Sequence, residues 1–291
     1  MIANNKNNKQ ISMNKNNKLK GINNAALILV ISLCNFYYVN CYTATALFGG
    51  MNSKCSEPHH QRLMDAMKKG LDQKQIDCFE TTLYVGIKFQ AELICEKLRS
   101  NDYYRNAFDI NLVGLSQGGL IARYILEECD ISPQTRFRNL LTLGTPHNGI
   151  SVIPAAACKS LDVAMRYICS MANGVLANLA FTDLMQSTIG PAGYIRNTNN
   201  LQYYKDKSKF LASLNNENNK GSEAYRKHKE RMESLNSFMM VLFEKDEIVF
   251  PIASEFFGEQ SAGESNRKEV SMQETDTYKN NDLGLKTLDE K

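Results

Sequence analysis

Residues 109–128 have the sequence DINLVGLSQGGLIARYILEE, and this stretch decides the fold. Its first six residues form an apolar run that predicts a strand, and residues 120–127 have the apolar spacing of a helix. Between them, Gly114, Ser116 and Gly118 match the pattern G-x-S-x-G, which places a serine on a tight strand-to-helix turn. Such a turn exposes the serine oxygen at the amino end of a helix, where the helix dipole favours negative charge. The alternative interpretation is a small-residue turn without chemistry.

Strands and helices alternate on both sides of this stretch. Apolar runs predict strands at residues 45–48, 138–144 and 237–243, and helical spacing predicts helices at residues 60–70 and 87–98. This alternation is typical of parallel βαβ units. We therefore expect an α/β fold, a mostly parallel sheet with helices on both faces. The mixed polar and apolar region from about 150 to 235 is expected to be a helical lid inserted between two strands.

Ser116 is the candidate nucleophile for acyl transfer, which also needs two N–H donors for the oxyanion. The first donor is expected from Gln117, the residue after the serine. The second is expected from Met51, in the loop that follows the strand at 45–48. A plain glycine turn at Gly49-Gly50 is the alternative for that loop.

The acid and base of a serine triad follow the nucleophile along the chain in the order acid, then histidine. Asp246 is the candidate acid, because it follows the strand at 237–243, and Glu244 and Glu247 are its neighbours and competitors. No histidine follows Asp246. We expect His147 to be structural, His59 and His60 to form a loop pair near the mouth of the site, and His228 to lie on a solvated helix face.

The amino-terminal region predicts a targeting signal. Residues 1–24 are rich in Asn and Lys, and an apolar run at 25–33 is too short to span a bilayer as a helix. We expect a signal peptide cleaved near residues 41–44, with an uncleaved anchor extending through 36–39 as the alternative. The net charge of +3 includes five lysines in the first twenty residues, so the remainder carries about −2. This balance gives no support for a nucleic-acid partner.

Cysteine usage agrees with a secreted protein. Six cysteines lie beyond the signal and are expected to form disulfides in an oxidising compartment: Cys55, Cys78, Cys95, Cys129, Cys158 and Cys169. Spacing alone leaves their pairing open. No metal motif and no organic cofactor motif is present, so none is expected.

Several short motifs together resemble the palmitoyl-protein thioesterases, which have the α/β-hydrolase fold. They occur in the family's order from about residue 45 to the end of the chain: 48–55 (FGGMNSKC), 114–119 (GLSQGG), 210–217 (FLASLNNE), 246–251 (DEIVFP), 254–258 (SEFFG), 273–278 (QETDTY) and 283–286 (LGLK). The resemblance departs from the family in the short stretch between Cys78 and Leu98, and at Phe48-Gly49, where the family has an aromatic residue and a histidine.

This resemblance implies an enzyme that removes palmitate and other long acyl groups from protein cysteines in the lysosome. It implies Ser116 as nucleophile, Asp246 as acid, and Met51 and Gln117 as oxyanion donors. It also implies the disulfides Cys95–Cys129 and Cys158–Cys169. The acyl groove is expected among apolar lid residues: Val163, Met165, Ile168, Met171, Val175, Leu176, Leu179, Phe181 and Met185.

The family's histidine follows the LGLK motif by about 20 residues, on a loop after one more strand. The sequence is therefore expected to be truncated before the final strand, the histidine loop and the last helix, and the chain as printed is expected to be nearly inactive. Two other functions stay open. One is a lipid-ester lipase of the same fold, because the turn at 145–149 resembles one found in many lipases. The other is a non-catalytic acyl-binding protein.

Overall fold

The computed structural model describes residues 42–151, 166, 178–261 and 268–291. The expected signal peptide, the Cys158–Cys169 disulfide and the lid residues from Val163 to Leu176 lie outside these ranges. No helix within these ranges combines the length and the apolar character that a membrane crossing requires.

A five-stranded parallel sheet forms the centre of the fold, with strand order β2-β1-β3-β4-β5. The strands are β1 (Thr43–Met51), β2 (Asp77–Thr81), β3 (Asp109–Leu115), β4 (Arg136–Leu143) and β5 (Ser237–Val241). The central strands β1 and β3 are buried along nearly their whole length, as expected for a parallel sheet covered on both faces. The predicted mostly parallel α/β fold is confirmed. Strand β2 was not predicted.

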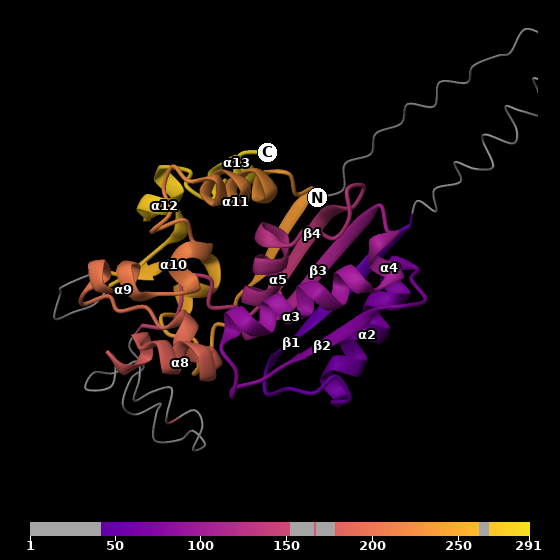
Figure 1. Cartoon of the computed structure of the whole chain (residues 1–291), viewed down its shortest axis with the longest axis horizontal. Coiled ribbons are helices and arrows are strands. Elements are labelled where there is room, and N and C mark those ends of the chain that lie inside the picture. Colours follow the sequence, from indigo (N-terminus) through magenta and orange to yellow (C-terminus); the bar gives the residue numbers. More distant parts are fainter. Residues whose placement is uncertain (1–41, 152–165, 167–177, 262–267) are drawn as a thin grey trace, which may run out of the picture. The chain divides into compact units, whose positions relative to one another are not determined.

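Helices cover both faces of the sheet, as predicted. On one face, α3 (Ile87–Ser100) and α5 (Gln117–Glu128) pack on a core that includes Phe48 and Leu112 (Figure 1). On the other face, Met64 of α2 (Pro58–Leu71) packs against Leu47 and Val113. Neighbouring strand residues thus face opposite layers, as strand geometry requires.

Short helices make up most of the remaining chain. They are α4 (Asp102–Arg105), α8 (Asp183–Thr188), α9 (Leu201–Lys207), α10 (Leu211–Leu214), α11 (Glu223–Glu233), α12 (Asp276–Lys279) and α13 (Leu285–Asp289), with 3-10 turns at Leu179–Phe181, Gly190–Tyr194, Ile252–Phe256 and Met272–Glu274. A small antiparallel pair joins β6 (Glu259–Gln260) to β7 (Glu269–Val270). The described part of the 150–235 region contains helices α8 to α11 separated by 3-10 turns and loops.

The topology creates a place for a site. From β1 the chain crosses to β2 on one side, and from β2 it returns to β3 on the other side of β1. Ligands of open α/β sheets bind where the strand order reverses, beyond the carboxyl ends of the strands. In this protein that place lies between the ends of β1 and β3, beside Met51 and Ser116.

Candidate active site

Ser116 occupies the sharp turn between β3 and α5. Its backbone has φ +50° and ψ −121°, a conformation that non-glycine residues rarely adopt. Its N–H donates a hydrogen bond of 2.8 Å to the carbonyl of Leu143, which fixes the turn to β4. The residue is half-buried, directly before the first residue of α5. The predicted strand–turn–helix is therefore present, and α5 begins at Gln117, three residues before the predicted helical stretch at 120–127.

The glycines of this turn allow a close approach of backbone segments. A Cβ atom at Gly114 would lie 2.3 Å from the Cα of Gly119, and one at Gly118 would lie 2.3 Å from the carbonyl oxygen of Phe48. Real Cβ atoms do not come this close to backbone atoms, so larger residues would force β1, β3 and α5 apart. A backbone conformation such as that of Ser116 costs about 1–3 kcal/mol, and this packing keeps Ser116 in it.

The loop after β1 faces the serine. A Cβ atom at Gly50 would lie 3.7 Å from the Cβ of Ser116. The Gly50 carbonyl accepts hydrogen bonds from Thr81 Oγ1 at 2.8 Å and from Ser53 Oγ at 2.6 Å. The Asn52 side chain accepts another, of 2.8 Å, from the N–H of Leu83. Met51 is the last residue of β1, which extends three residues beyond the predicted strand end at residue 48, and it is followed by a turn held firmly at the edge of the sheet where Ser116 lies.

Gln117 is buried, and its side chain is held by two hydrogen bonds. Its Nε2 donates to the carbonyl of Thr82 at 3.2 Å, and its Oε1 accepts from the Tyr194 hydroxyl at 3.1 Å. The backbone N–H of the first residue of a helix has no partner within the helix. The two side-chain hydrogen bonds thus fix Gln117 in place. Its backbone N–H remains available to bind a ligand.

Asp246 lies on the loop after β5, at the same edge of the sheet. Its Oδ1 accepts hydrogen bonds from the N–H groups of Ile248, at 2.6 Å, and Val249, at 2.9 Å. Its Oδ2 lies 3.8 Å from the position of a Cβ atom at Gly144, the residue that follows Leu143. Asp246 is half-buried, whereas its competitors Glu244 and Glu247 are exposed. No hydrogen bond joins Asp246 to Ser116.

Glu255 is a buried carboxyl group beside Asp246 for which the sequence suggested no role. Its side chain is 1% exposed, and its Oε2 accepts a 2.8 Å hydrogen bond from the N–H of Phe243. Its Oε1 is buried without a donor when both carboxyl groups are charged, and a proton on Glu255 allows a hydrogen bond to Asp246. Burial, followed by the negative charge of Asp246, raises the pKa of Glu255 to about 7, against the opposing effect of the Phe243 N–H. The two carboxyl groups therefore favour a state in which Glu255 keeps its proton.

None of the four histidines, all of which are described, is hydrogen-bonded to Ser116 or Asp246. His147 is fully buried, its Nε2 lies 2.8 Å from Thr142 Oγ1, and its ring stacks on Phe257. Burial lowers the pKa of His147 well below its ordinary value. These contacts agree with the expected structural role.

Two expectations about histidines are wrong. His228 is 1% exposed and does not lie on a solvated face, because its ring bridges Glu128 at 2.7 Å and Asn216 at 3.0 Å. His59 and His60 are not in a loop. They lie in the first turn of α2, where Pro58 opens the helix.

Two disulfides hold the described part of the chain. Cys95–Cys129 joins α3 to the end of α5, and this predicted pair is confirmed. Cys55–Cys78 joins the segment before α2 to β2. The second pair was not predicted, because the sequence left the partners of these cysteines open.

Comparisons with known proteins agree with this fold. Residues 44–291 match the family described as palmitoyl protein thioesterase. Palmitoyl-protein thioesterase 1 of Caenorhabditis elegans is 26% identical over 280 residues, which cover 90% of this chain and 87% of that protein. A palmitoyl-protein thioesterase–dolichyl pyrophosphate phosphatase fusion of Schizosaccharomyces pombe is 31% identical over 207 residues, 70% of this chain and 30% of the fusion. Among solved structures, phospholipase PlaB from Legionella pneumophila has a TM-score of 0.45 and 13% identity, over 79% of this chain and 50% of that chain.

Proposed function

Because the chain belongs to the palmitoyl protein thioesterase family, a family of hydrolases with the α/β-hydrolase fold, we propose that it cleaves long-chain fatty acyl thioesters from protein cysteines. The observation that carries this proposal is the conformation of Ser116. A serine at positive φ is held at the start of a helix, opposite a tightly bonded loop. Strain of this kind is found where a side chain must be presented for chemistry.

In the proposed reaction, Ser116 Oγ attacks the thioester carbonyl carbon and its proton passes to a base. The carbon–sulfur bond breaks, the substrate cysteine leaves, and an acyl–serine ester remains. Water then cleaves this ester and releases the fatty acid. The backbone N–H groups of Gln117 and Met51 are proposed to bind the oxyanion of each tetrahedral intermediate, which the start of α5 also stabilises.

Asp246 is proposed as the acid that orients and stabilises a histidine base. A serine hydroxyl is a poor nucleophile without such a base. None of the four histidines lies beside Asp246, because His147 and His228 are engaged in the core and His59 and His60 lie on α2.

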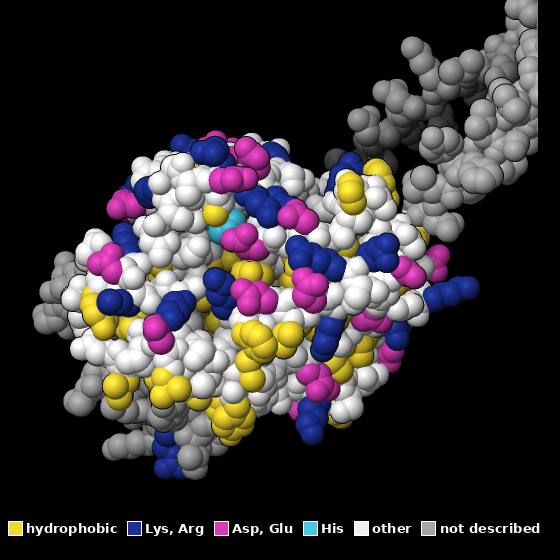
Figure 2. All heavy atoms as spheres, viewed as in Figure 1, with side chains coloured by type: hydrophobic (Ala, Val, Ile, Leu, Met, Phe, Trp, Pro, Cys, Tyr) yellow, Lys and Arg dark blue, Asp and Glu magenta, His cyan; other side chains and the backbone are white. Residues whose placement is uncertain are grey.

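Apolar surface near the site supports a lipid-bearing substrate. Large hydrophobic side chains are exposed on α3, on α8 and on the segment before α3: Tyr84, Phe89, Leu93 and Leu184. Figure 2 shows hydrophobic side chains on the face that carries α3 and α8. This surface adjoins the site, because Thr82, two residues before Tyr84, accepts the hydrogen bond of Gln117. The acyl groove is proposed to continue into the lid, where Leu179 and Met185 are the described candidates, whereas Phe181 is buried in the core against Tyr203 and Tyr204. Each buried methylene contributes about 0.8 kcal/mol, so binding should strengthen with chain length.

The two disulfides agree with a protein of the secretory pathway, since such bonds persist in oxidising compartments. We propose a lysosomal or extracellular location on this basis, with S-palmitoylated proteins as substrates.

A serine-directed fluorophosphonate probe tests the nucleophile. Because no histidine lies beside Asp246, we expect only prolonged incubation with excess probe to label the wild-type chain and the variant Ser100→Ala, which lacks an exposed serine at the end of α3, and we expect Ser116→Ala to stay unlabelled. Labelling of Ser116→Ala at the wild-type level would show that Ser116 is not the nucleophile. An unlabelled wild-type chain that still binds palmitate would instead indicate the acyl-binding function.

A substrate panel separates thioesterase from lipase. Palmitoyl thioesters and palmitoyl oxygen esters with matched leaving groups should be tested on the same preparation. We expect the thioesters to be hydrolysed faster, and a preference for the oxygen esters would favour the lipase.

A further inference from the structure

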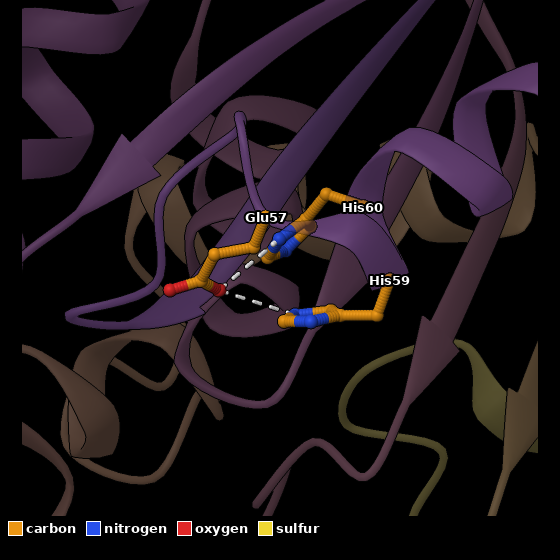
Figure 3. A group of neighbouring side chains, drawn as sticks. All are labelled: Glu57, His59 and His60. Atoms are coloured by element: carbon orange, nitrogen blue, oxygen red, sulfur yellow. Dashed lines mark ion pairs between the residues drawn. The ribbon is translucent and has the colours of Figure 1, made fainter.

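Three side chains of the kinds that bind transition metals face one another at the start of α2. Glu57 precedes the helix, and His59 and His60 lie in its first turn (Figure 3). The Glu57 Oε2 atom is 3.4 Å from His59 Nε2 and 3.7 Å from His60 Nδ1. One ligand atom from each of the three residues lies within 4.8 Å of the other two. This is the one such group found in the part of the chain that the structure describes.

His60 is the residue that needs a partner. It is fully buried, yet neither ring nitrogen has a hydrogen-bond partner, which commonly costs about 1–3 kcal/mol for a buried polar group. Neutral imidazole presents a lone pair, which is the form that binds metal ions.

We propose that Glu57, His59 and His60 bind a divalent transition-metal ion, with Zn²⁺ as the best match. Zinc takes imidazole nitrogen and carboxylate oxygen at about 2.0–2.2 Å, so ligand atoms around a tetrahedral ion lie about 3.3–3.5 Å apart. The 3.4 Å separation between Glu57 and His59 falls within this spacing, and the 3.7 Å separation between Glu57 and His60 is slightly longer, so a small side-chain adjustment would complete the site. His59 is half exposed and free to adjust, and water would take the fourth position. Ca²⁺ and Mg²⁺ prefer oxygen ligands and fit less well.

The surrounding contacts hold the site in place without an ion. The Cys55–Cys78 disulfide fixes the segment before Glu57 to β2. The N–H of Cys55 donates to Glu80 Oε1 at 3.0 Å, and Gln61 Nε2 donates to the Cys55 carbonyl at 2.7 Å. A site that is already ordered loses less conformational entropy when it binds.

The proposed metal site adjoins the loop that carries Met51. A Cβ atom at Gly49 would lie 3.4 Å from His60 Nε2 and 3.0 Å from Ser53 Oγ. The Ser53 hydroxyl, in turn, is hydrogen-bonded to the Gly50 carbonyl. Fixing the His60 ring through a metal ion would therefore stiffen the support of this loop. The proposal itself does not depend on the thioesterase function.

Isothermal titration with ZnCl₂ tests the proposal on the untagged, oxidised full chain, after free thiols have been alkylated. We expect one ion per chain with a Kd below about 10 µM, and a Tm that rises with zinc concentration. His59→Ala and Glu57→Gln change exposed or half-exposed residues, so folding should survive. Each should weaken binding at least tenfold.

Asp65→Asn is the matched control, because it removes an exposed carboxylate from the same helix. It should bind zinc as the wild type does. Equal binding by wild type, His59→Ala and Glu57→Gln would overturn the proposal, as would a wild type that binds no zinc at these concentrations.

Discussion

Single glycines determine how closely the elements around Ser116 approach. At Gly118 a Cβ atom would lie 2.3 Å from the Phe48 carbonyl oxygen and 2.4 Å from that of Gly49. Both are backbone atoms of β1, which cannot move away without disturbing the sheet. We expect Gly118→Ala to lower the free energy of unfolding by about 1–3 kcal/mol, measured by urea denaturation.

Gly70 provides the control for this substitution. It lies in α2, and no atom would come within 4 Å of a Cβ there. Alanine is favoured over glycine in helices, so Gly70→Ala should stabilise the protein by up to about 1 kcal/mol. A Gly118→Ala variant as stable as Gly70→Ala would show that α5 and β1 do not approach each other this closely.

Glu255 should make stability depend on pH. Its ordinary pKa of 4.5 applies to the unfolded chain, and its pKa in the folded chain is about 7. Between these values only the folded chain holds the proton, so stability from this group is complete below pH 4.5 and declines as pH rises to 7. Glu255→Gln keeps the shape without the titration, so its Tm should decline less than that of the wild type over this range. Glu247→Gln, an exposed change in the neighbouring loop, should leave the wild-type decline largely intact.

The sequence predicted those site residues whose signal is local. Ser116 and Gln117 were identified because strand, turn and helix follow one another without a break, and Asp246 because it follows a predicted strand. Glu255 and His60 gave no such signal. Their properties come from burial beside residues that are distant in the sequence, and the spacing of Glu57, His59 and His60 matches no regular metal motif.

At the scale of elements, strong periodicity gave correct predictions and weak periodicity did not. Helix α3 buries Ile87, Ala91, Ile94 and Leu98 on one face, a spacing that is visible in the sequence. Strand β2, with the sequence DCFET, has only one fully buried residue and sits at the edge of the sheet. Its place depends on pairing with β1, and the pattern of such a short polar segment cannot show that pairing.

The Cys95–Cys129 disulfide joins two of these elements. It links α3 to the end of α5 across 34 residues of chain, so it restricts the unfolded chain more than the folded one. We expect the double substitution Cys95→Ala and Cys129→Ala to lower the free energy of unfolding by about 2–4 kcal/mol relative to the oxidised wild type, measured by denaturation in urea. A double variant as stable as the wild type would show that packing of α3 on α5 suffices without the bond.

At the scale of the whole described domain, Arg123 joins segments that lie far apart in the sequence. It is fully buried in α5, where its Nε donates to Glu127 Oε1 at 2.9 Å. Its other nitrogens donate to Asn215 Oδ1 at 2.8 Å and to the Leu214 carbonyl at 3.0 Å. The guanidinium thereby attaches the segment around α10 to the central helix, a connection that the helical pattern of 120–127 did not indicate.

Removing Arg123 should consequently weaken the whole domain. Arg123→Ala leaves the Glu127 carboxylate buried without its partner, a loss of about 3–5 kcal/mol in the free energy of unfolding. The exposed pair of Arg105 with Asp102 is the control, because Arg105→Ala should cost at most about 1 kcal/mol. Replacing both buried partners, by Arg123→Met with Glu127→Leu, should recover part of the loss, since no uncompensated charge remains. Denaturation curves of the three variants decide the matter, and equal losses for Arg123→Ala and Arg105→Ala would show that Arg123 does not hold the domain together.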